Sequence, residues 1–345
     1  GIKSEYDKLR DDFANKKTVK QYLRFEEAQK NHAVIDWDNF TPVAPTFTGT
    51  KTFDHYSLKE IAEYIDWQPF FIAWEMHGKF PALLSDPVIG KEATVLYNDA
   101  QKLLQQIVDE KWLNAKGAIG FWPANKTGPD SVDVLADKEI VKLQFLRQQI
   151  KKAAGQPNLS LADFIAPAEK NYQDHIGAFA VTIEGVEPHI KKFEAAFDDY
   201  NKIILQALAD RLAEAFAELL HKKTRQEYWG YATDEHLTNE ELIHEKYQGI
   251  RPAPGYPACP DHTEKYKLFD LLNATETVGI TLTESLAMYP ASSVCGWYFS
   301  HPQSMYFGIG KIQPDQFEDY TNRKEMSKDE MERCHDRRHC KSRKR

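Results

Sequence analysis

Four prolines within nine residues, from Pro252 to Pro260, constrain this chain more than any other part of its sequence. Each proline fixes φ and lacks a backbone N–H, so the segment can form neither an α-helix nor a central strand. The prolines hold the segment extended and reduce the entropy that it would lose on binding a ligand. Gly255 permits a sharp turn or a close approach to a ligand, and Arg251 offers a planar guanidinium suited to a carboxylate. From these residues alone, the segment is either a rigid connector or a ligand-binding loop.

The composition excludes several classes of protein. The chain has 345 residues, of which 42% are hydrophobic and 28% are charged, so it can bury a large core and is neither disordered nor fibrous. No apolar run approaches the roughly 18 residues that a membrane span needs, and the charged start after Gly1 lacks the apolar core of a signal peptide. Four cysteines are too few for a disulfide scaffold. We therefore expect a soluble, cytoplasmic protein that does not interact with membranes.

Charge is distributed unevenly along the chain. Residues 333–345 contain seven Lys or Arg and one Asp, a net +6 in a chain of net charge −8, so the other residues carry −14. Such an acidic body argues against nucleic-acid binding, because phosphate binding needs a basic surface. The tail also has zinc-ligand residue types, but they lie within seven residues and lack a second pair at zinc-finger spacing: Cys334, His335, His339 and Cys340. We expect a disordered, solvated basic tail over 331–345 and no metal site.

Apolar residues at helical spacing predict helices that begin at Ser57, near residue 90 and at Thr238, that run over 199–228 and that include 266–272. Ser57 is a typical N-cap residue, and Thr238 with Glu241 forms a capping box. Residues 1–30 are highly charged and are predicted to be a helical entry segment or linker.

β-branched and aromatic residues predict strands over 117–122, where Pro123 would end the strand, and over 176–183, 294–299 and 305–312. The last two are predicted to form an antiparallel hairpin through 301–304. Because strands and helices do not alternate regularly, the sequence favours an α+β fold over a doubly wound parallel sheet.

Three acidic residues of the predicted helix over 199–228 share one face, because Asp210, Glu214 and Glu218 are four residues apart. This acidic ridge is either a solvated face or a hydrogen-bonding surface toward a partner. The phosphate-binding, dinucleotide-binding, zinc-protease and hydrolase motifs are absent from the sequence, so we name no catalytic residue.

The segment from Arg251 to Pro260, with Asp261–Lys265 after it, resembles the C-terminal activation (reactivation) domain of cobalamin-dependent methionine synthase, which binds S-adenosylmethionine. The R-x-x-x-G-Y motif of that family stands at Arg251, Gly255 and Tyr256. The resemblance covers about residues 30–330 in order and includes residues 66–71, 117–125, 161–167, 176–181, 198–202, 207–218, 228–231 and 296–302.

The resemblance implies a single C-shaped α+β domain over 31–330, with a central twisted antiparallel β-sheet flanked by helices. It also implies a set of residues that bind S-adenosylmethionine: Asp66, Arg251, Gly255, Tyr256, Tyr306 and Phe307. Arg251 suits the carboxylate of this ligand, Asp66 suits its ribose hydroxyls or ammonium, and the ring of Tyr306 suits its sulfonium or adenine. Phe307 stands where the family often has a second tyrosine.

The resemblance further implies a role within a larger enzyme. The family domain docks over the cobalamin-binding domain of the same enzyme, and flavodoxin or another reductase supplies an electron. Methyl transfer from S-adenosylmethionine then returns inactive cob(II)alamin to the active cycle. Candidate residues of the docking face are Asp210, Glu214, Glu245 and Tyr256. The chain by itself is not expected to make methionine.

Two other functions remain open at this point. One is a non-catalytic protein of the same fold that senses S-adenosylmethionine; the acidic face and Tyr256 argue against it, because such a sensor does not need them. The other is a free-standing methyltransferase, which is disfavoured because no activating base or acceptor pocket can be named. Residues 327–333 fit the family and Cys334 onward does not, so the tail is assigned no function.

Overall fold

The computed structural model of the chain describes residues 20–170, 172–327 and 331. Its helices are α2 (Phe25–Lys30), α3 (Leu58–Ala62), α4 (Gln68–Ala73), α5 (Gly90–Asp109), α6 (Val186–Ala195), α7 (Asp199–Lys223), α8 (Asn239–Ile243), α9 (Glu264–Leu272), α10 (Ala274–Val278) and α11 (Pro314–Arg323). Its strands are β1 (Gly49–Tyr56), β2 (Asn114–Gly128), β3 (Ser131–Ala136), β4 (Glu139–Gln144), β5 (Asp174–Glu184), β6 (Thr281–Leu282), β7 (Met288–Tyr289) and β8 (Ser293–Tyr298). Short 3₁₀ turns cover Ala82–Ser85, Leu161–Phe164 and Ala168–Lys170, and a π-helical turn, Thr224–Tyr228, extends α7.

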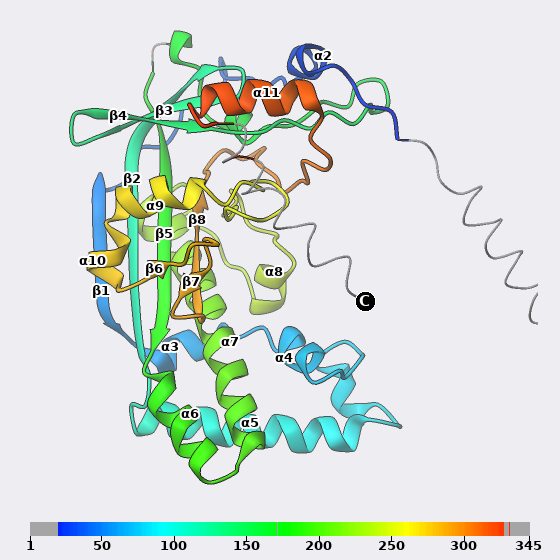
Figure 1. Cartoon of the computed structure of the whole chain (residues 1–345), viewed down its shortest axis with the longest axis vertical. Coiled ribbons are helices and arrows are strands. Elements are labelled where there is room, and N and C mark those ends of the chain that lie inside the picture. Colours follow the sequence, from blue (N-terminus) through cyan, green and yellow to red (C-terminus); the bar gives the residue numbers. More distant parts are fainter. Residues whose placement is uncertain (1–19, 171, 328–330, 332–345) are drawn as a thin grey trace, which may run out of the picture.

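The centre of the fold is a six-stranded sheet in the order β4-β3-β2-β5-β8, with β1 paired to β2, and all of its strand pairs are antiparallel. The long strand β2 pairs with β1 up to Phe121 and with β3 from Ala124 onward. Two arms extend from the ends of the sheet toward the same side and give the domain a C-shaped outline (Figure 1). The predicted α+β fold with a central antiparallel sheet is confirmed.

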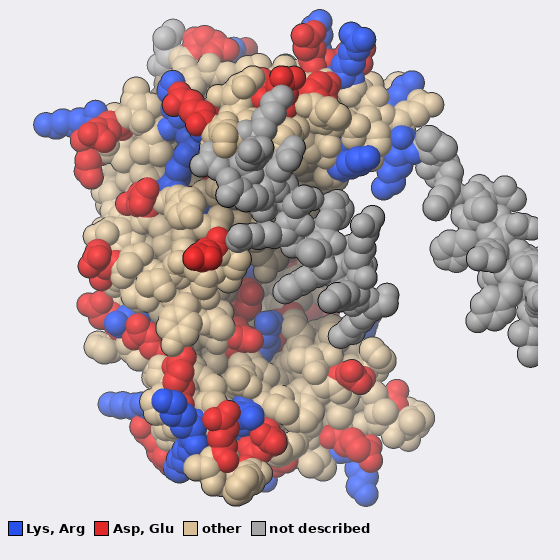
Figure 2. Space-filling view, in the orientation of Figure 1, with Lys and Arg blue, Asp and Glu red and all other residues tan. Residues whose placement is uncertain are grey.

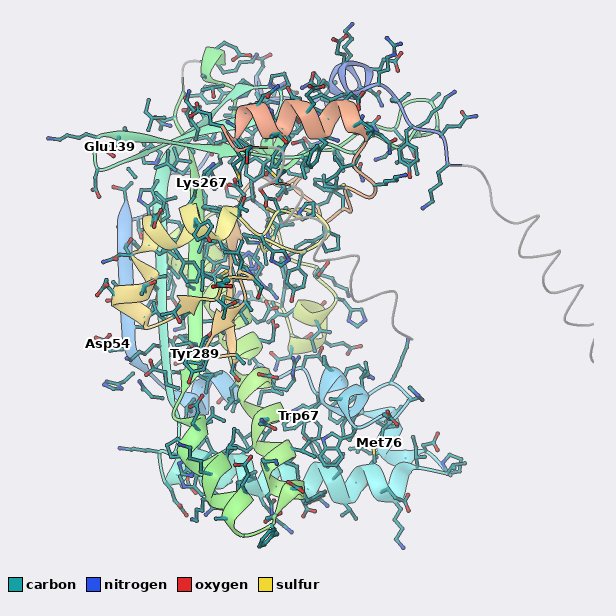
Figure 3. All side chains as sticks on the ribbon, viewed as in Figure 1. Asp54, Trp67, Met76, Glu139, Lys267 and Tyr289 are labelled. Atoms are coloured by element: carbon teal, nitrogen blue, oxygen red, sulfur yellow. The ribbon has the colours of Figure 1, made fainter. Side chains whose placement is uncertain are left out.

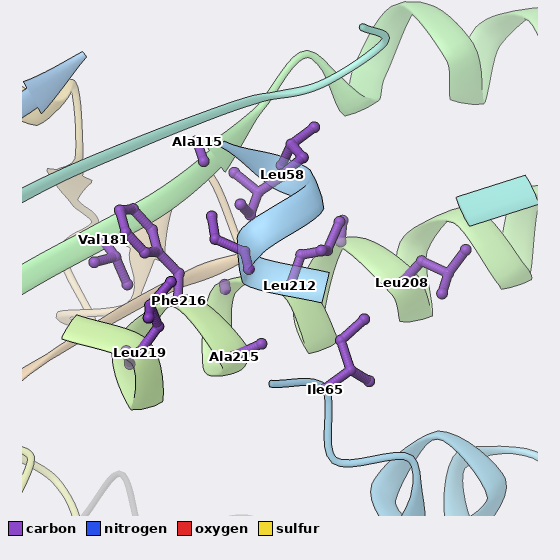
Figure 4. Close-up of a cluster of buried hydrophobic side chains, with 14 of the residues drawn as sticks. Leu58, Ile65, Ala115, Val181, Leu208, Leu212, Ala215, Phe216 and Leu219 are labelled. Carbon is purple, nitrogen blue, oxygen red and sulfur yellow. The ribbon is translucent and has the colours of Figure 1, made fainter. Parts of the chain in front are cut away.

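Both faces of the central strands are covered by a hydrophobic core. Neighbouring residues of a strand point to opposite faces and therefore belong to different cores. On β5, Phe179 and Val181 belong to one hydrophobic core, while Ala178 and Ala180 belong to another. The first core lies between the sheet and the helices α3, α4, α5 and α7. Figure 4 shows its centre, where the apolar side chains of α7 meet those of the neighbouring elements: Leu58, Ala115, Val181, Leu208, Leu212, Ala215, Phe216 and Leu219.

The predicted helix starts are confirmed in atomic detail. The Ser57 hydroxyl accepts the backbone N–H of Glu60 at 3.3 Å, as an N-cap of α3 should. At α8, Thr238 and Glu241 each accept the other's backbone N–H, at 3.3 Å and 3.1 Å. The described helices include none that is long and apolar enough to cross a membrane. The predicted bounds of the entry segment and of the tail stay predictions, since residues 1–19 and 332–345 lie outside the described part.

Two predictions about strands are wrong. β2 does not end at Pro123 but continues to Gly128, paired with β5 along one edge as far as Ala124. The proline is tolerated because it lies where the other edge of β2 changes partner from β1 to β3. The hairpin does not form either, since residues 305–312 are not a strand. Residues 250–252 occupy that edge of β8: Ile250 and Phe299 exchange two backbone hydrogen bonds of 3.0 Å, and Trp297 N–H donates to the Pro252 carbonyl at 2.9 Å. The proline-rich segment therefore lies beside β8, where the hairpin was predicted.

His301, in the turn after β8, fixes the N-terminal segment of the domain and leads to a testable dependence of stability on pH. Its buried ring contacts Trp37 and Phe40 with centroid distances of 4.6 Å and 4.5 Å. Burial lowers the pKa of His301 to about 4, whereas an unfolded histidine titrates near pH 6.5. The unfolded chain therefore takes up a proton that the folded chain does not, and stability falls as pH drops from about 6.5 toward 4.

We expect His301→Phe to remove this pH-dependent loss of stability, which lowers the free energy of unfolding by about 1–2 kcal/mol at a pH of about 5. Urea unfolding of the wild type and of His301→Phe gives the difference between their free energies of unfolding at a pH of about 7 and at a pH of about 5. The change in this difference between the two pH values measures the effect of His301. An unchanged difference between the two pH values would contradict the prediction.

Candidate functional site

A cavity of about 360 Å³ opens between the proline-rich segment, α7, β8 and residues 306–307. Six residues singled out from the sequence line it: Glu214, Glu245, Arg251, Tyr256, Tyr306 and Phe307. The other walls are largely apolar and include Phe179, Met288 and Val294. A concave, mostly apolar site with a few convergent charged and aromatic groups is typical of a small-molecule pocket.

Arg251 is held by three side chains of its own protein. Its Nη2 donates to the Glu218 carboxylate at 2.7 Å, and its Nη1 donates to the Tyr247 hydroxyl at 2.8 Å and to His221 Nδ1 at 3.1 Å. Burial by itself would lower the pKa of Arg251, but the charge of Glu218 raises it above its usual value. These contacts use three of the five N–H groups of the guanidinium and leave two without a partner among the described residues. The guanidinium therefore already holds one carboxylate of its own protein, and its predicted contact with the carboxylate of a ligand stays a prediction.

Tyr306 connects the site to the backbone of the proline-rich segment. Its hydroxyl oxygen accepts the backbone N–H of Arg251 at 2.9 Å and lies 3.3 Å from the hydroxyl of Tyr247. The neighbouring Phe307 contacts the ring of Phe164 edge-on at a centroid distance of 6.3 Å. Both Tyr306 and Phe307 therefore present half-buried rings to the cavity from a firmly held segment.

Sequence reasoning did not identify Tyr247 and His221 as part of this site. His221 is fully buried and stacks on Tyr298 at 5.2 Å, with 13° between the rings. Burial and the nearby arginine charges keep the pKa of His221 well below its usual value, so the ring is neutral. Because Arg251 can only donate, Nδ1 accepts and the ring proton lies on Nε2, which has no partner among the described residues. The available signal was the position of His221, three residues after Glu218 on the same helix.

Gly255 has a conformation that other residues could not adopt here. Its φ is +97°, and a Cβ added to it would lie 2.2 Å from the ring of His262. A hydrogen bond of 2.7 Å from Gly255 N–H to the Cys259 carbonyl closes the turn. Tyr256 is 62% exposed and lies on the cavity wall. Gly255 therefore shapes the segment, while Tyr256 is the residue that meets the cavity.

The remaining predicted residues lie outside the cavity wall. The Asp66 carboxylate accepts the backbone N–H of Gln68 at 2.9 Å at the start of α4, and the adjacent Trp67 lies between α4 and α7 in Figure 3. Asp210 is exposed and accepts a hydrogen bond of 2.7 Å from the Ser292 hydroxyl. The acidic ridge thus divides into three environments, with Asp210 on the surface, Glu214 in the cavity wall and Glu218 paired with Arg251.

A buried ion cluster fixes the far end of the proline-rich segment. Lys324, at the end of α11, donates to Asp261 at 2.9 Å and to the Thr263 hydroxyl at 2.7 Å, and it also pairs with Glu264. Tyr320 of α11 donates to Asp261 at 2.8 Å. Burial alone would raise the pKa of Asp261, but the charge of Lys324 holds it well below its usual value. Helix α11 is therefore bound directly to Asp261, the residue that follows the last proline of the proline-rich segment.

The charged surface around these elements is mixed. Figure 2 shows acidic side chains spread over both arms of the domain, interspersed with lysines and arginines. The tail residues with zinc-ligand chemistry, Cys334, His335, His339 and Cys340, lie outside the described residues.

Residues 57–325 match the family described as vitamin B12 dependent methionine synthase, activation domain. The chain is also similar to a solved crystal structure of the MetH reactivation domain bound to AdoHcy. The two chains are 48% identical, the match covers 90% of this chain and 97% of the other, and the TM-score is 0.87. The motif, the fold and these matches agree, and the chain belongs to the family of vitamin B12 dependent methionine synthase activation domains.

Proposed function

We propose that the cavity beside Arg251 binds S-adenosylmethionine and that the domain uses it to reactivate cob(II)alamin in methionine synthase, a methyltransferase. The observation that carries this proposal is the convergence of Arg251, Tyr256, Tyr306 and Phe307, all named from the family motif or resemblance, on one cavity of about 360 Å³. The similar crystal structure holds AdoHcy (S-adenosylhomocysteine), which differs from S-adenosylmethionine by one methyl group and one positive charge.

The chemistry of the cavity fits this ligand. The ligand has a carboxylate, for which Arg251 retains two N–H groups, and an adenine and a sulfonium, which suit the rings of Tyr306 and Phe307. The carboxylates of Glu214 and Glu245 line the same cavity and favour a cationic ligand over a neutral one. Asp66 lies outside the wall, and its assignment to the ribose hydroxyls or ammonium of the ligand rests on the family resemblance. Gly255 contributes through the shape of the turn.

When bound, S-adenosylmethionine supplies the methyl group. The residues of this chain hold the ligand, exclude water from one side through the apolar wall and keep the cavity mouth open toward a partner. Around that mouth lie exposed residues that we propose as the docking face for the cobalamin-binding domain: Asp210, Glu214, Glu245 and Tyr256. We further propose that flavodoxin or another reductase supplies the electron. Two buried free thiols, Cys259 and Cys295, suit the reducing cytoplasm that we propose for the protein.

Calorimetric titration of the chain with S-adenosylmethionine tests the proposal, and we expect saturable binding. S-adenosylhomocysteine and 5′-methylthioadenosine both have a neutral sulfur, but only the former carries the amino-acid carboxylate. We expect 5′-methylthioadenosine to bind at least about tenfold more weakly than S-adenosylhomocysteine, the effect of losing a hydrogen bond to a charged group. No binding to the folded chain, or equal binding of the two neutral compounds, would contradict the proposed site.

A second experiment separates reactivation from simple sensing. The chain is mixed with the cobalamin-binding domain, a reductant and S-adenosylmethionine, and methylcobalamin is followed by its absorbance. Formation of methylcobalamin supports reactivation, whereas ligand binding without methylcobalamin would favour the sensor.

A further inference from the structure

Tyr247 contacts two proposed ligand-binding residues without lining the cavity itself. It lies four residues before Arg251, and only 8% of its surface is exposed. Its hydroxyl is 2.8 Å from Nη1 of Arg251 and 3.3 Å from the hydroxyl of Tyr306. The buried hydroxyl of Tyr247 therefore links the guanidinium of Arg251 to the hydroxyl of Tyr306.

The donors fix two of the three hydrogen bonds. The guanidinium of Arg251 can only donate, so the oxygen of Tyr247 accepts from it, and the oxygen of Tyr306 accepts the backbone N–H of Arg251 at 2.9 Å. Between the two hydroxyls, either oxygen can be the donor. In the arrangement where Tyr247 donates, Tyr306 keeps its own hydroxyl proton for a third group, and its side chain lines the cavity.

The ring of Tyr247 is held in place independently of these hydrogen bonds. The guanidinium of Arg225 lies 4.3 Å from its centroid, and the ring of His221 meets it edge-on at 4.8 Å. Arg225 is itself fixed by Glu235, through hydrogen bonds of 2.8 Å and 2.7 Å. The packing of the ring is thus separable from the function of the hydroxyl.

We propose that Tyr247 is a positioning residue, whose hydroxyl fixes the guanidinium of Arg251 relative to Tyr306 and leaves the Tyr306 hydroxyl as a hydrogen-bond donor to the ligand. This inference rests on the proposed function, in which the cavity binds S-adenosylmethionine.

The test is Tyr247→Phe, which removes the hydroxyl and keeps the ring with its contacts to Arg225 and His221. We expect calorimetry to show S-adenosylmethionine binding weakened about fivefold to twentyfold, the effect of a lost hydrogen bond to a charged group and a misdirected hydroxyl. The melting temperature should change little, because the ring carries the packing. If Tyr247→Phe fails to fold, the inference is overturned, since the hydroxyl then serves stability.

Tyr231→Phe is the matched control. The Tyr231 hydroxyl is also buried and has no hydrogen-bond partner among the described residues, and the ring packs on Trp229. We expect its affinity to stay within about twofold of the wild type, as for a hydroxyl that does not act on the site.

A double-mutant cycle with Tyr306→Phe distinguishes positioning from a general loss of structure. If Tyr247 acts partly through the Tyr306 hydroxyl, the two substitutions together weaken binding by at least about threefold less than the product of their separate effects. Additive effects would overturn the inference, as would unchanged affinity of Tyr247→Phe while the wild type binds. Failure of the wild type to bind would instead overturn the proposed function.

Discussion

Replacing Arg251 by alanine is expected to weaken S-adenosylmethionine binding by about tenfold to a hundredfold, which calorimetric titration measures directly. The substitution removes the two N–H groups that we assign to the carboxylate of the ligand, but it keeps the backbone N–H that donates to the Tyr306 hydroxyl. Arg24→Ala is the matched control, because Arg24 is exposed beside α2, does not line the cavity and should leave the affinity unchanged. Equal affinities of the two variants would contradict the assignment.

The same substitution also affects stability, and a second variant separates the two effects. Without Arg251, the carboxylate of Glu218, only 12% exposed, loses its charged partner. Removal of one partner of a largely buried pair is costly because the other charge stays desolvated. We expect Arg251→Ala/Glu218→Ala to recover much of the lost stability in urea unfolding while its affinity stays low. Recovery of affinity together with stability would show that Arg251 acts only on the fold.

Lys324→Met is expected to produce the largest loss of stability, about 3–5 kcal/mol in the free energy of unfolding, as measured by urea denaturation. Its side chain is 4% exposed, and its ammonium group is shared by the buried carboxylates of Asp261 and Glu264. Without it Asp261 would lose its charged partner, and Glu264 would keep only Lys267, at 3.3 Å. The methionine keeps most of the apolar volume, so the loss reports on charge rather than on packing.

The control for this variant is Lys102→Met, in which an exposed salt bridge is removed. Lys102 is 80% exposed and lies 3.6 Å from Asp99, so we expect a change below about 1 kcal/mol. A similar small change in Lys324→Met would contradict the view that the buried cluster anchors the end of the proline-rich segment to α11.

The elements that could be predicted from the sequence are those whose signals are local. Ser57 and Thr238 cap helices with residues three positions away, so neighbouring sequence is sufficient to place the helix starts. The predicted hairpin of β8 failed because the choice of partner was not local. Residues 250–252 and 305–312 both lay within reach of the same edge, and the backbone groups of the former occupy it.

The same distinction applies to the candidate site. The motif named Arg251 and Tyr256, and the family resemblance added Tyr306 and Phe307, which the fold brings to one cavity. The sequence did not indicate that Glu218, on the long helix α7, would accept a hydrogen bond from the guanidinium of Arg251. Nor did it indicate Tyr247, because a tyrosine after a short helix carries no signal until the fold places Arg251 and Tyr306 around it.

The contact between α11 and Asp261 has a consequence for the synthesis of the protein. Ribosomes make the chain from its N-terminus, so α7 and the proline-rich segment emerge while Lys324 has yet to be translated. Until then the carboxylate of Asp261 lacks the ammonium group with which it pairs in the complete domain, and the turn at Gly255 is joined to an unanchored end. The end of the proline-rich segment, which forms one wall of the cavity, is therefore anchored to α11 only when almost the whole domain has been translated.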